Sequence, residues 1–128
     1  MKKCLIVDDS AVIRKIIRQN LESHGFVCRE AENGQIAVDA CKEDMPEVVF
    51  LDWNMPVMTG IEFLRALRAL PKGDTPIVLF CTTESTMSFI TEALAAGAND
   101  FIMKPFDAEI LLTKLEQNNL IPYGDVHA

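Results

Sequence analysis

The chain has 128 residues, 49% of them hydrophobic, and this length fits a single domain that buries its core without help from disulfides or metals. Its formal net charge of −7 argues against direct binding to DNA or RNA, because an acidic surface repels phosphates. No apolar run reaches the roughly 18 residues of a membrane span, and the start is too short and too acidic for a signal peptide, so we expect a cytoplasmic protein without membrane insertion.

Short apolar runs, rich in β-branched or aromatic residues, alternate along the chain with segments of helical periodicity. The runs are Cys4–Val7, Val27–Ala31, Val48–Leu51, Ile77–Cys81 and Phe101–Met103. Most of them are typical of strands that are buried on both faces of a parallel sheet. Arg29 and Glu30 interrupt the second run, which favours a strand at the edge of the sheet.

A helix is predicted after each run. The first closes at His24-Gly25, the second runs from about Gly34 to Glu43, and the third begins at Thr59, where the spacing to Glu62 is that of a capping box. The fourth ends at Gly97 and the fifth starts near Asp107. Their expected apolar faces are Ile13, Ile16, Ile17 and Leu21 in the first helix, Met87, Ile90 and Leu94 in the fourth, and Ile110, Leu111 and Leu115 in the fifth.

This alternation of strands and helices predicts an α/β fold, in which five parallel strands carry five helices on both faces. Right-handed crossovers leave few topologies. An edge position for the second strand favours the order 2-1-3-4-5, which is the flavodoxin-like arrangement. We expect one domain over residues 1–119 and a short C-terminal tail over residues 120–128, where Pro122 and Gly124 break helical structure.

Charged or hydroxyl side chains follow four of the predicted strands. Asp8 and Asp9 follow the first, Asp52 the third, Thr82 the fourth and Lys104 the fifth. Because functional sites in open parallel sheets form beyond the carboxyl ends of the strands, these side chains should gather at one edge. Taken singly, each has a plainer explanation as a helix cap, a turn residue or a solvated charge. Their coincidence at strand ends carries the functional interpretation.

The predicted cluster has a definite chemistry. Three carboxylates that lie close together repel one another, and a hard divalent cation such as Mg²⁺, which prefers oxygen ligands, removes the conflict. The ammonium of Lys104 would add a counter-charge. Such a site suits phosphoryl transfer, in which catalysis is mostly positioning and charge neutralisation, and a carboxylate in it can itself be the nucleophile.

From about Lys3 to Asn118, the sequence resembles the response-regulator receiver family of two-component systems. No effector domain accompanies the resemblance, so the chain is most similar to the stand-alone, chemotaxis-type regulators. The matching motifs are Leu5-Ile6-Val7-Asp8-Asp9-Ser10, Asp52-Trp53-Asn54-Met55-Pro56-Val57-Met58-Thr59-Gly60-Ile61-Glu62, Thr82-Thr83-Glu84, Ala96-Gly97-Ala98 and Lys104-Pro105-Phe106.

The resemblance implies a role for each matching residue in the chemistry. Asp52 would be the phosphoacceptor, loaded from a phosphohistidine on a histidine kinase or a histidine phosphotransfer protein. Asp9, Asp52 and the backbone carbonyl of Asn54 would bind Mg²⁺, and Asp8 would act mainly through a coordinated water. Lys104 would pair with a phosphoryl oxygen.

The resemblance also implies a switch. Thr82 would move its hydroxyl onto the phosphoryl group, and Phe101 would then turn inward and reshape the face formed by helix 4, strand 5 and helix 5. Pro105 would follow a cis peptide bond from Lys104. The expected protein is a signalling switch that catalyses only its own phosphorylation and dephosphorylation, and acts as a monomer or weak dimer on a downstream protein.

Two other classes of function remain as alternatives. One is a constitutive interaction domain that keeps the fold but no longer switches. The other is an enzyme, either a phosphohydrolase or a flavin carrier. Haloacid-dehalogenase-type phosphatases place a second Asp where Asn54 stands, and no Gly-rich phosphate loop follows the first strand. Both features count against an enzyme. The sequence does not separate an output messenger from a phosphate shuttle or sink.

Overall fold

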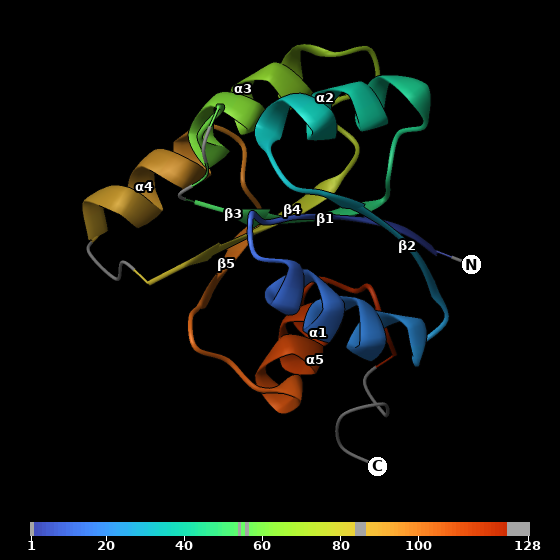
Figure 1. Cartoon of the computed structure of the whole chain (residues 1–128). Helices are drawn as coiled ribbons and strands as arrows, with labels where there is room; N and C mark the ends of the chain where they lie inside the picture. Colours follow the sequence, from blue (N-terminus) through green and yellow to red (C-terminus); the bar gives the residue numbers. More distant parts are fainter. Residues whose placement is uncertain (1, 54, 56, 84–86, 123–128) are drawn as a thin grey trace.

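The computed structural model describes residues 2–53, 55, 57–83 and 87–122, and these form one sheet flanked by helices (Figure 1). The strands are β1 (Lys2–Val7), β2 (Phe26–Ala31), β3 (Val48–Asp52), β4 (Ile77–Thr82) and β5 (Asp100–Met103). All neighbouring strands pair in parallel, in the order β2-β1-β3-β4-β5. The predicted α/β class and strand order are confirmed.

The burial of each strand follows its sequence. Every residue of β3 is buried, as are Cys4–Val7 of β1, whereas exposed and buried residues alternate through much of β2. Within the described residues β2 pairs with β1 alone, so it forms an edge of the sheet. The charged residues Arg29 and Glu30 therefore lie where a sheet tolerates them best, at an edge.

The helices lie in two layers. They are α1 (Ala11–Glu22), α2 (Gly34–Glu43), α3 (Gly60–Ala69), α4 (Met87–Ala95) and α5 (Ala108–Gln117). Figure 1 shows α2, α3 and α4 on one face of the sheet and α1 and α5 on the other. Such a two-sided cover follows from right-handed crossovers between parallel strands.

Side-chain caps begin four of these helices. The Oγ of Ser10 accepts a hydrogen bond from the backbone N–H of Ile13 at 3.3 Å, and Asn33 and Asp107 cap α2 and α5 in the same way. Thr59 caps α3, and the Glu62 carboxylate accepts a hydrogen bond from the Thr59 backbone N–H, so the capping box that the spacing predicts is confirmed. Such caps satisfy backbone N–H groups that a helix leaves without partners.

A hydrophobic core fills each layer. The first lies under α2, α3 and α4 and includes Phe63, Phe80 and Trp53. The second lies under α1 and α5 and includes Phe50, Ile17 and Leu115. Among the described residues, no helix is long and apolar enough to cross a membrane.

Some expected core residues are exposed. Ile16 of α1 is 46% exposed, and Leu94 of α4 and Ile110 of α5 are each 45% exposed. The buried stripe of α1 is narrower than the predicted one, because this helix contacts the sheet mainly through Ile17 and Leu21. An apolar residue one position away from that stripe is turned by about 100° around the helix and faces outward.

The expected C-terminal tail also needs correction at its start. Leu120 and Ile121 are only 7% exposed and pack in the core under α1 and α5, so these two residues are not a frayed end. Their apolar side chains continue the buried stripe of α5, and the Leu120 N–H donates to the carbonyl of Leu115 at 2.8 Å. Gly124 lies outside the described residues.

Candidate functional site

Three charged side chains meet at the carboxyl ends of the strands. Asp52 is the last residue of β3, and Asp8 and Lys104 directly follow β1 and β5. The Nζ of Lys104 lies 2.9 Å from Asp8 Oδ2 and 3.0 Å from Asp52 Oδ1. Lys104 is 96 positions from Asp8 and 52 positions from Asp52 in the sequence. Its ammonium group contacts both carboxylates, as the sheet topology predicts.

A third carboxylate completes the cluster. One oxygen each from Asp8, Asp9 and Asp52 lie within 4.8 Å of one another. Asp8 is 3% exposed and Asp52 is 8% exposed, whereas Asp9 is exposed. The cluster therefore has a floor made by buried Asp8 and Asp52 and half-buried Lys104, and an open side at Asp9.

The turn after β1 is held by its own hydrogen bonds. The Asp8 N–H donates to the carbonyl of Ala31 at 3.1 Å, and the Ser10 N–H donates to Asp8 Oδ1 at 2.9 Å. Ser10, not either aspartate, is the N-cap of α1. The plainer reading of Asp8 and Asp9 as helix caps is therefore wrong, and their carboxylates remain available to the cluster.

The electrostatics of the cluster are those of crowded carboxylates. Burial raises the pKa of Asp52 above its ordinary value, and repulsion from Asp8 adds to this rise, while Lys104 opposes it. Burial alone lowers the pKa of Lys104, but its hydrogen bonds to Asp8 and Asp52 outweigh this and raise it overall. The ammonium is firmly charged, and Asp52 gives up its proton less readily than an exposed aspartate.

The donor set fits Mg²⁺. Three carboxylates face the single ammonium of Lys104, so ionising all three leaves negative charge that one lysine does not neutralise. The candidate ligand atoms are all carboxylate oxygens, which suit a hard divalent cation better than zinc or another soft metal. Asn54, whose carbonyl was expected among the ligands, lies outside the described residues.

The two residues predicted to switch lie on the neighbouring strands β4 and β5. Thr82 ends β4 and is 2% exposed, and its carbonyl accepts the backbone N–H of Lys104 at 2.8 Å. The Lys104–Pro105 peptide bond is cis. Phe101 is half-buried on β5, and its ring centroid lies 5.9 Å from that of Phe80. Phe80 in turn contacts Trp53, directly after Asp52.

A contact at Phe101 was not anticipated from the sequence. The Nζ of Lys114 on α5 lies 4.9 Å from the centroid of the Phe101 ring and 3.0 Å from Asp100 Oδ1. Asn118 donates to the other oxygen of Asp100 at 3.2 Å. A cation over an aromatic face is attracted by the ring quadrupole, so α5 contacts this ring through Lys114. The charges on α5 carry no sequence signal that names their partner.

Gly60 is a second position that sequence reasoning did not single out. A Cβ added there would lie 2.5 Å from the carbonyl oxygen of Asp52 and 3.1 Å from Trp53 Cα. The Gly60 N–H also donates to the carbonyl of Trp53 at 3.1 Å. The start of α3 therefore touches the backbone that carries Asp52, and only a residue without a side chain allows this approach.

We expect Gly60→Ala to destabilise the fold, because Asp52 and Trp53 must move to admit the methyl group. Overpacking of this kind costs about 1–2 kcal/mol, and urea unfolding followed by circular dichroism measures it. Ala66→Gly, at a half-buried position of the same helix, changes the same pair of residue types without touching Asp52. A Gly60→Ala variant as stable as the parent would show that the segment after β3 yields easily.

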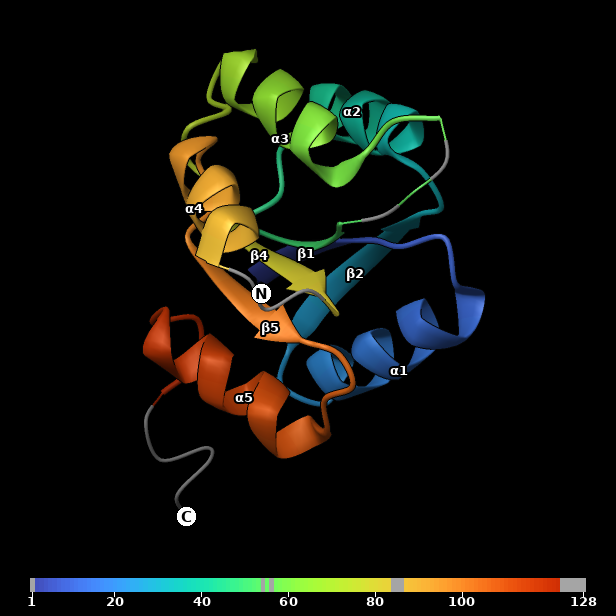
Figure 2. The ribbon, with the colours of Figure 1, turned by 90° about the vertical axis from the view of Figure 1, so that its left-hand side faces the viewer.

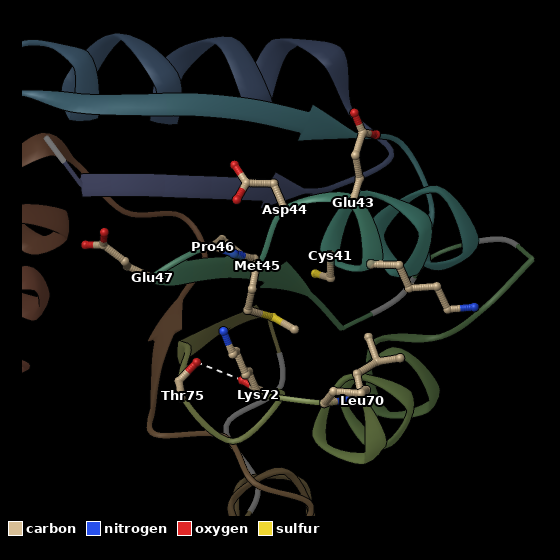
Figure 3. Close-up of a pocket in the computed structure, with 11 residues that line it drawn as sticks. Cys41, Glu43, Asp44, Met45, Pro46, Glu47, Leu70, Lys72 and Thr75 are labelled. Carbon is tan, nitrogen blue, oxygen red and sulfur yellow. Dashed lines mark hydrogen bonds between the residues drawn. The ribbon is translucent and has the colours of Figure 1, made fainter.

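A pocket of about 820 Å³ lies between the end of α2 and the segment after α3, and Figure 3 shows residues that line it. Its lining includes Cys41, Glu47 and Lys72. Because Glu47 immediately precedes β3, this pocket lies at the amino ends of the strands. It includes none of the predicted site residues, and the chemistry of the cluster lies at the opposite end of the sheet.

The comparison with protein families agrees with this geometry. Residues 4–116 match the response regulator receiver domain. The chain belongs to this family. It is a CheY-like receiver, which is a signalling switch and not a conventional enzyme. Its acidic cluster of Asp8, Asp9 and Asp52 is typical of the magnesium sites at which receivers are phosphorylated.

Individual relatives match over nearly the whole chain. The chemotaxis protein CheY of Pseudomonas aeruginosa is 40% identical over 116 residues, which cover 90% of this chain and 94% of the relative. CheY of Bacillus subtilis is 38% identical, with coverage of 90% and 95%. The solved structure of Vibrio cholerae CheY4 superposes with a TM-score of 0.87 at 36% identity, covering 91% of this chain and 98% of that one.

One further solved structure bears on the metal. The receiver domain of a sensor histidine kinase from Pseudomonas aeruginosa carries a magnesium ion coordinated in its active site cleft. It superposes with a TM-score of 0.82 at 26% identity and covers 91% of this chain and 95% of that one. The same fold in that receiver thus holds the cation that the carboxylates of this chain fit.

Proposed function

We propose that this receiver is a phosphorylation-controlled binding module in which Asp52 accepts the phosphoryl group and the face formed by α4, β5 and α5 changes in response. The observation that carries the proposal is the contact of one ammonium, on Lys104, with both Asp8 and Asp52 beside Asp9. Membership of the receiver family implies a histidine kinase as the phosphodonor. A histidine phosphotransfer protein would offer the same phosphohistidine chemistry.

Phosphoryl transfer at this site needs a carboxylate nucleophile and neutralisation of charge. An oxygen of Asp52 attacks phosphorus while the bond from phosphorus to the donor's imidazole nitrogen breaks, and the electron pair leaves with that nitrogen. Asp9 and Asp52 would hold Mg²⁺ directly, with the Asn54 carbonyl, and Asp8 would act mainly through water. The cation neutralises charge on the phosphoryl oxygens when bound. Lys104 exchanges its contact with Asp52 for one with a phosphoryl oxygen.

The response at the surface depends on Thr82 and Phe101. The Thr82 hydroxyl moves toward the phosphoryl group, and the space beside it admits the Phe101 ring. From α5, Lys114 contacts that ring and pairs with Asp100 of β5, so a turn of Phe101 disturbs α5 as well as β5. Figure 2 views the face on which β5 lies between α4 and α5. The charge of the phosphoryl group thereby shifts the equilibrium between two conformations of the face formed by α4, β5 and α5.

The remaining parts of the proposal concern partners and extent. The domain spans residues 1–119 and also takes in Leu120 and Ile121, which pack in its core. The protein works in the cytoplasm as a monomer or weak dimer, and its changed face binds a downstream protein. Similarity to chemotaxis proteins named CheY supports a role in chemotaxis-like signalling.

The experiment that tests the switch uses beryllium fluoride, which mimics a phosphoryl group on a carboxylate. We expect ¹H–¹⁵N spectra with Mg²⁺ and beryllium fluoride to show shifts at Asp52 and Thr82, and also at Phe101 and Lys114. Asp52→Asn should show none of them, whereas Asp39→Asn, an exposed position of α2, should respond as the parent does. Shifts confined to the acidic cluster would contradict switching and favour a constitutive interaction domain.

A further inference from the structure

The turn that carries Asp8 and Asp9 is held from outside by an arginine. The Nη1 of Arg14, on α1, donates a hydrogen bond of 2.6 Å to the backbone carbonyl oxygen of Asp8. The backbone N–H of Asp8 donates a hydrogen bond to the carbonyl of Ala31 in β2. Both backbone groups of Asp8 are therefore fixed, one by the sheet and one by a guanidinium.

Arg14 is itself oriented by the sheet. Its Nε lies 2.9 Å from Glu30 Oε1, and Glu30 precedes Ala31 in β2, beside Ile6 in the strand register. The side chain of Arg14 is only 15% exposed. Hydrogen bonds from Arg18 and Arg14 lower the pKa of Glu30, so this carboxylate stays charged and holds the guanidinium in place. The planar guanidinium fork of Arg14 has several N–H donors in fixed directions, so it binds Glu30 and the Asp8 carbonyl at the same time.

The acidic cluster needs such a restraint. Asp8 and Asp9 lie on one turn and face Asp52, and the three carboxylates repel one another in a partly buried place. Repulsion pushes the turn away from Asp52. A charge-assisted hydrogen bond to the Asp8 carbonyl opposes this movement.

We propose that Arg14 is a positioning residue for the magnesium site. Held by Glu30, it fixes the backbone of Asp8 so that the carboxylates of Asp8 and Asp9 meet that of Asp52. It touches neither metal nor phosphoryl group and acts only through the turn. This inference rests on the proposed magnesium-dependent function, which it extends to a residue outside the acidic cluster.

Arg18 provides a matched control. Its Nη1 forms an ion pair with the other oxygen of the same Glu30 at 2.8 Å, from the same helix, and it also pairs with Glu22 at 3.4 Å. None of its described bonds reaches the turn. Arg14→Ala and Arg18→Ala each remove an ion pair to Glu30, but only Arg14→Ala releases the carbonyl of Asp8.

Isothermal titration of Mg²⁺ into each variant, with urea unfolding in parallel, tests the proposal. We expect Arg14→Ala to raise the Kd for Mg²⁺ about 10- to 100-fold, which is the usual effect of losing a group that orients a ligand. Arg18→Ala should keep the parent Kd even where it loses as much stability. Arg14→Lys should give an intermediate Kd, because an ammonium lacks the fork that serves Glu30 and Asp8 together.

The outcomes separate this proposal from the function it extends. An equal rise in Kd for Arg14→Ala and Arg18→Ala, or no rise for either, would overturn the role of Arg14 while Mg²⁺ binding by the parent upholds the site. No Mg²⁺ binding by the parent would overturn the proposed function itself. If Arg14→Ala does not fold, the pair Arg14→Lys and Arg18→Lys decides, because only the first should raise the Kd.

Discussion

Replacing Lys104 by Ala should destabilise the metal-free protein by about 2–3 kcal/mol, since loss of one partner leaves buried charge uncompensated. The Lys104 ammonium contacts both Asp8 and Asp52, and the Lys104 side chain is 19% exposed. Because the pair is partly open to solvent, the expected loss of stability is smaller than for a fully buried ion pair. Mg²⁺ should restore much of this loss, because a cation bound only by the folded state stabilises that state. Urea unfolding with and without Mg²⁺ measures both effects.

Two controls accompany this variant. Lys42→Ala removes an exposed lysine from α2 and should change stability little. Lys104→Met keeps most of the side-chain volume but not the charge, so it should resemble Lys104→Ala if charge is the cause. A Lys104→Ala protein as stable as the parent without Mg²⁺ would mean that Asp8 and Asp52 are not ionised together.

The second large effect is expected from Asp52→Asn, which should weaken Mg²⁺ binding by about 100-fold or more, because losing a ligand costs at least as much as losing a group that orients one. The same change should stabilise the metal-free fold. Burial and the charge of Asp8 raise the pKa of Asp52, so its ionisation works against folding. An amide keeps an oxygen for Lys104 without the negative charge. This gain in stability should appear at neutral pH as a higher urea concentration at the unfolding midpoint of Asp52→Asn than at that of the parent.

The pH dependence of this gain has a definite sign. Because the folded-state pKa of Asp52 lies above its unfolded value of about 3.9, the parent is favoured below that value and loses this advantage as pH rises through the folded pKa. The stability difference between Asp52→Asn and the parent should therefore be small in acid and grow toward neutral pH. Urea unfolding at several pH values measures it, and a difference that shrinks with rising pH would contradict the account.

The sheet and most of the site were predictable because both depend on local sequence and topology. Asp52 ends one strand and Asp8 and Lys104 directly follow two others, so parallel strands bring these three residues to one edge. The capping box likewise follows from two residues, Thr59 and Glu62, that are three positions apart in the sequence. Arg29 and Glu30 marked the edge strand because few other places in a parallel sheet accept charge.

The contacts that were missed depend on side-chain direction across elements. Arg14 reaches the carbonyl of Asp8, and Lys114 reaches Asp100 and Phe101, but an arginine or lysine on a helix surface carries no local sign of its partner. The close approach of Gly60 to Asp52 depends on how the segment after β3 returns to the sheet.

The most direct test of the central claim is the intact mass of the protein after incubation with acetyl phosphate and Mg²⁺. We expect a single adduct of about 80 Da, the mass that one phosphoryl group adds. It should be absent from Asp52→Asn and from a sample with chelator, and present in Asp39→Asn. An adduct of equal occupancy on Asp52→Asn would contradict the assignment of Asp52 as the phosphoacceptor.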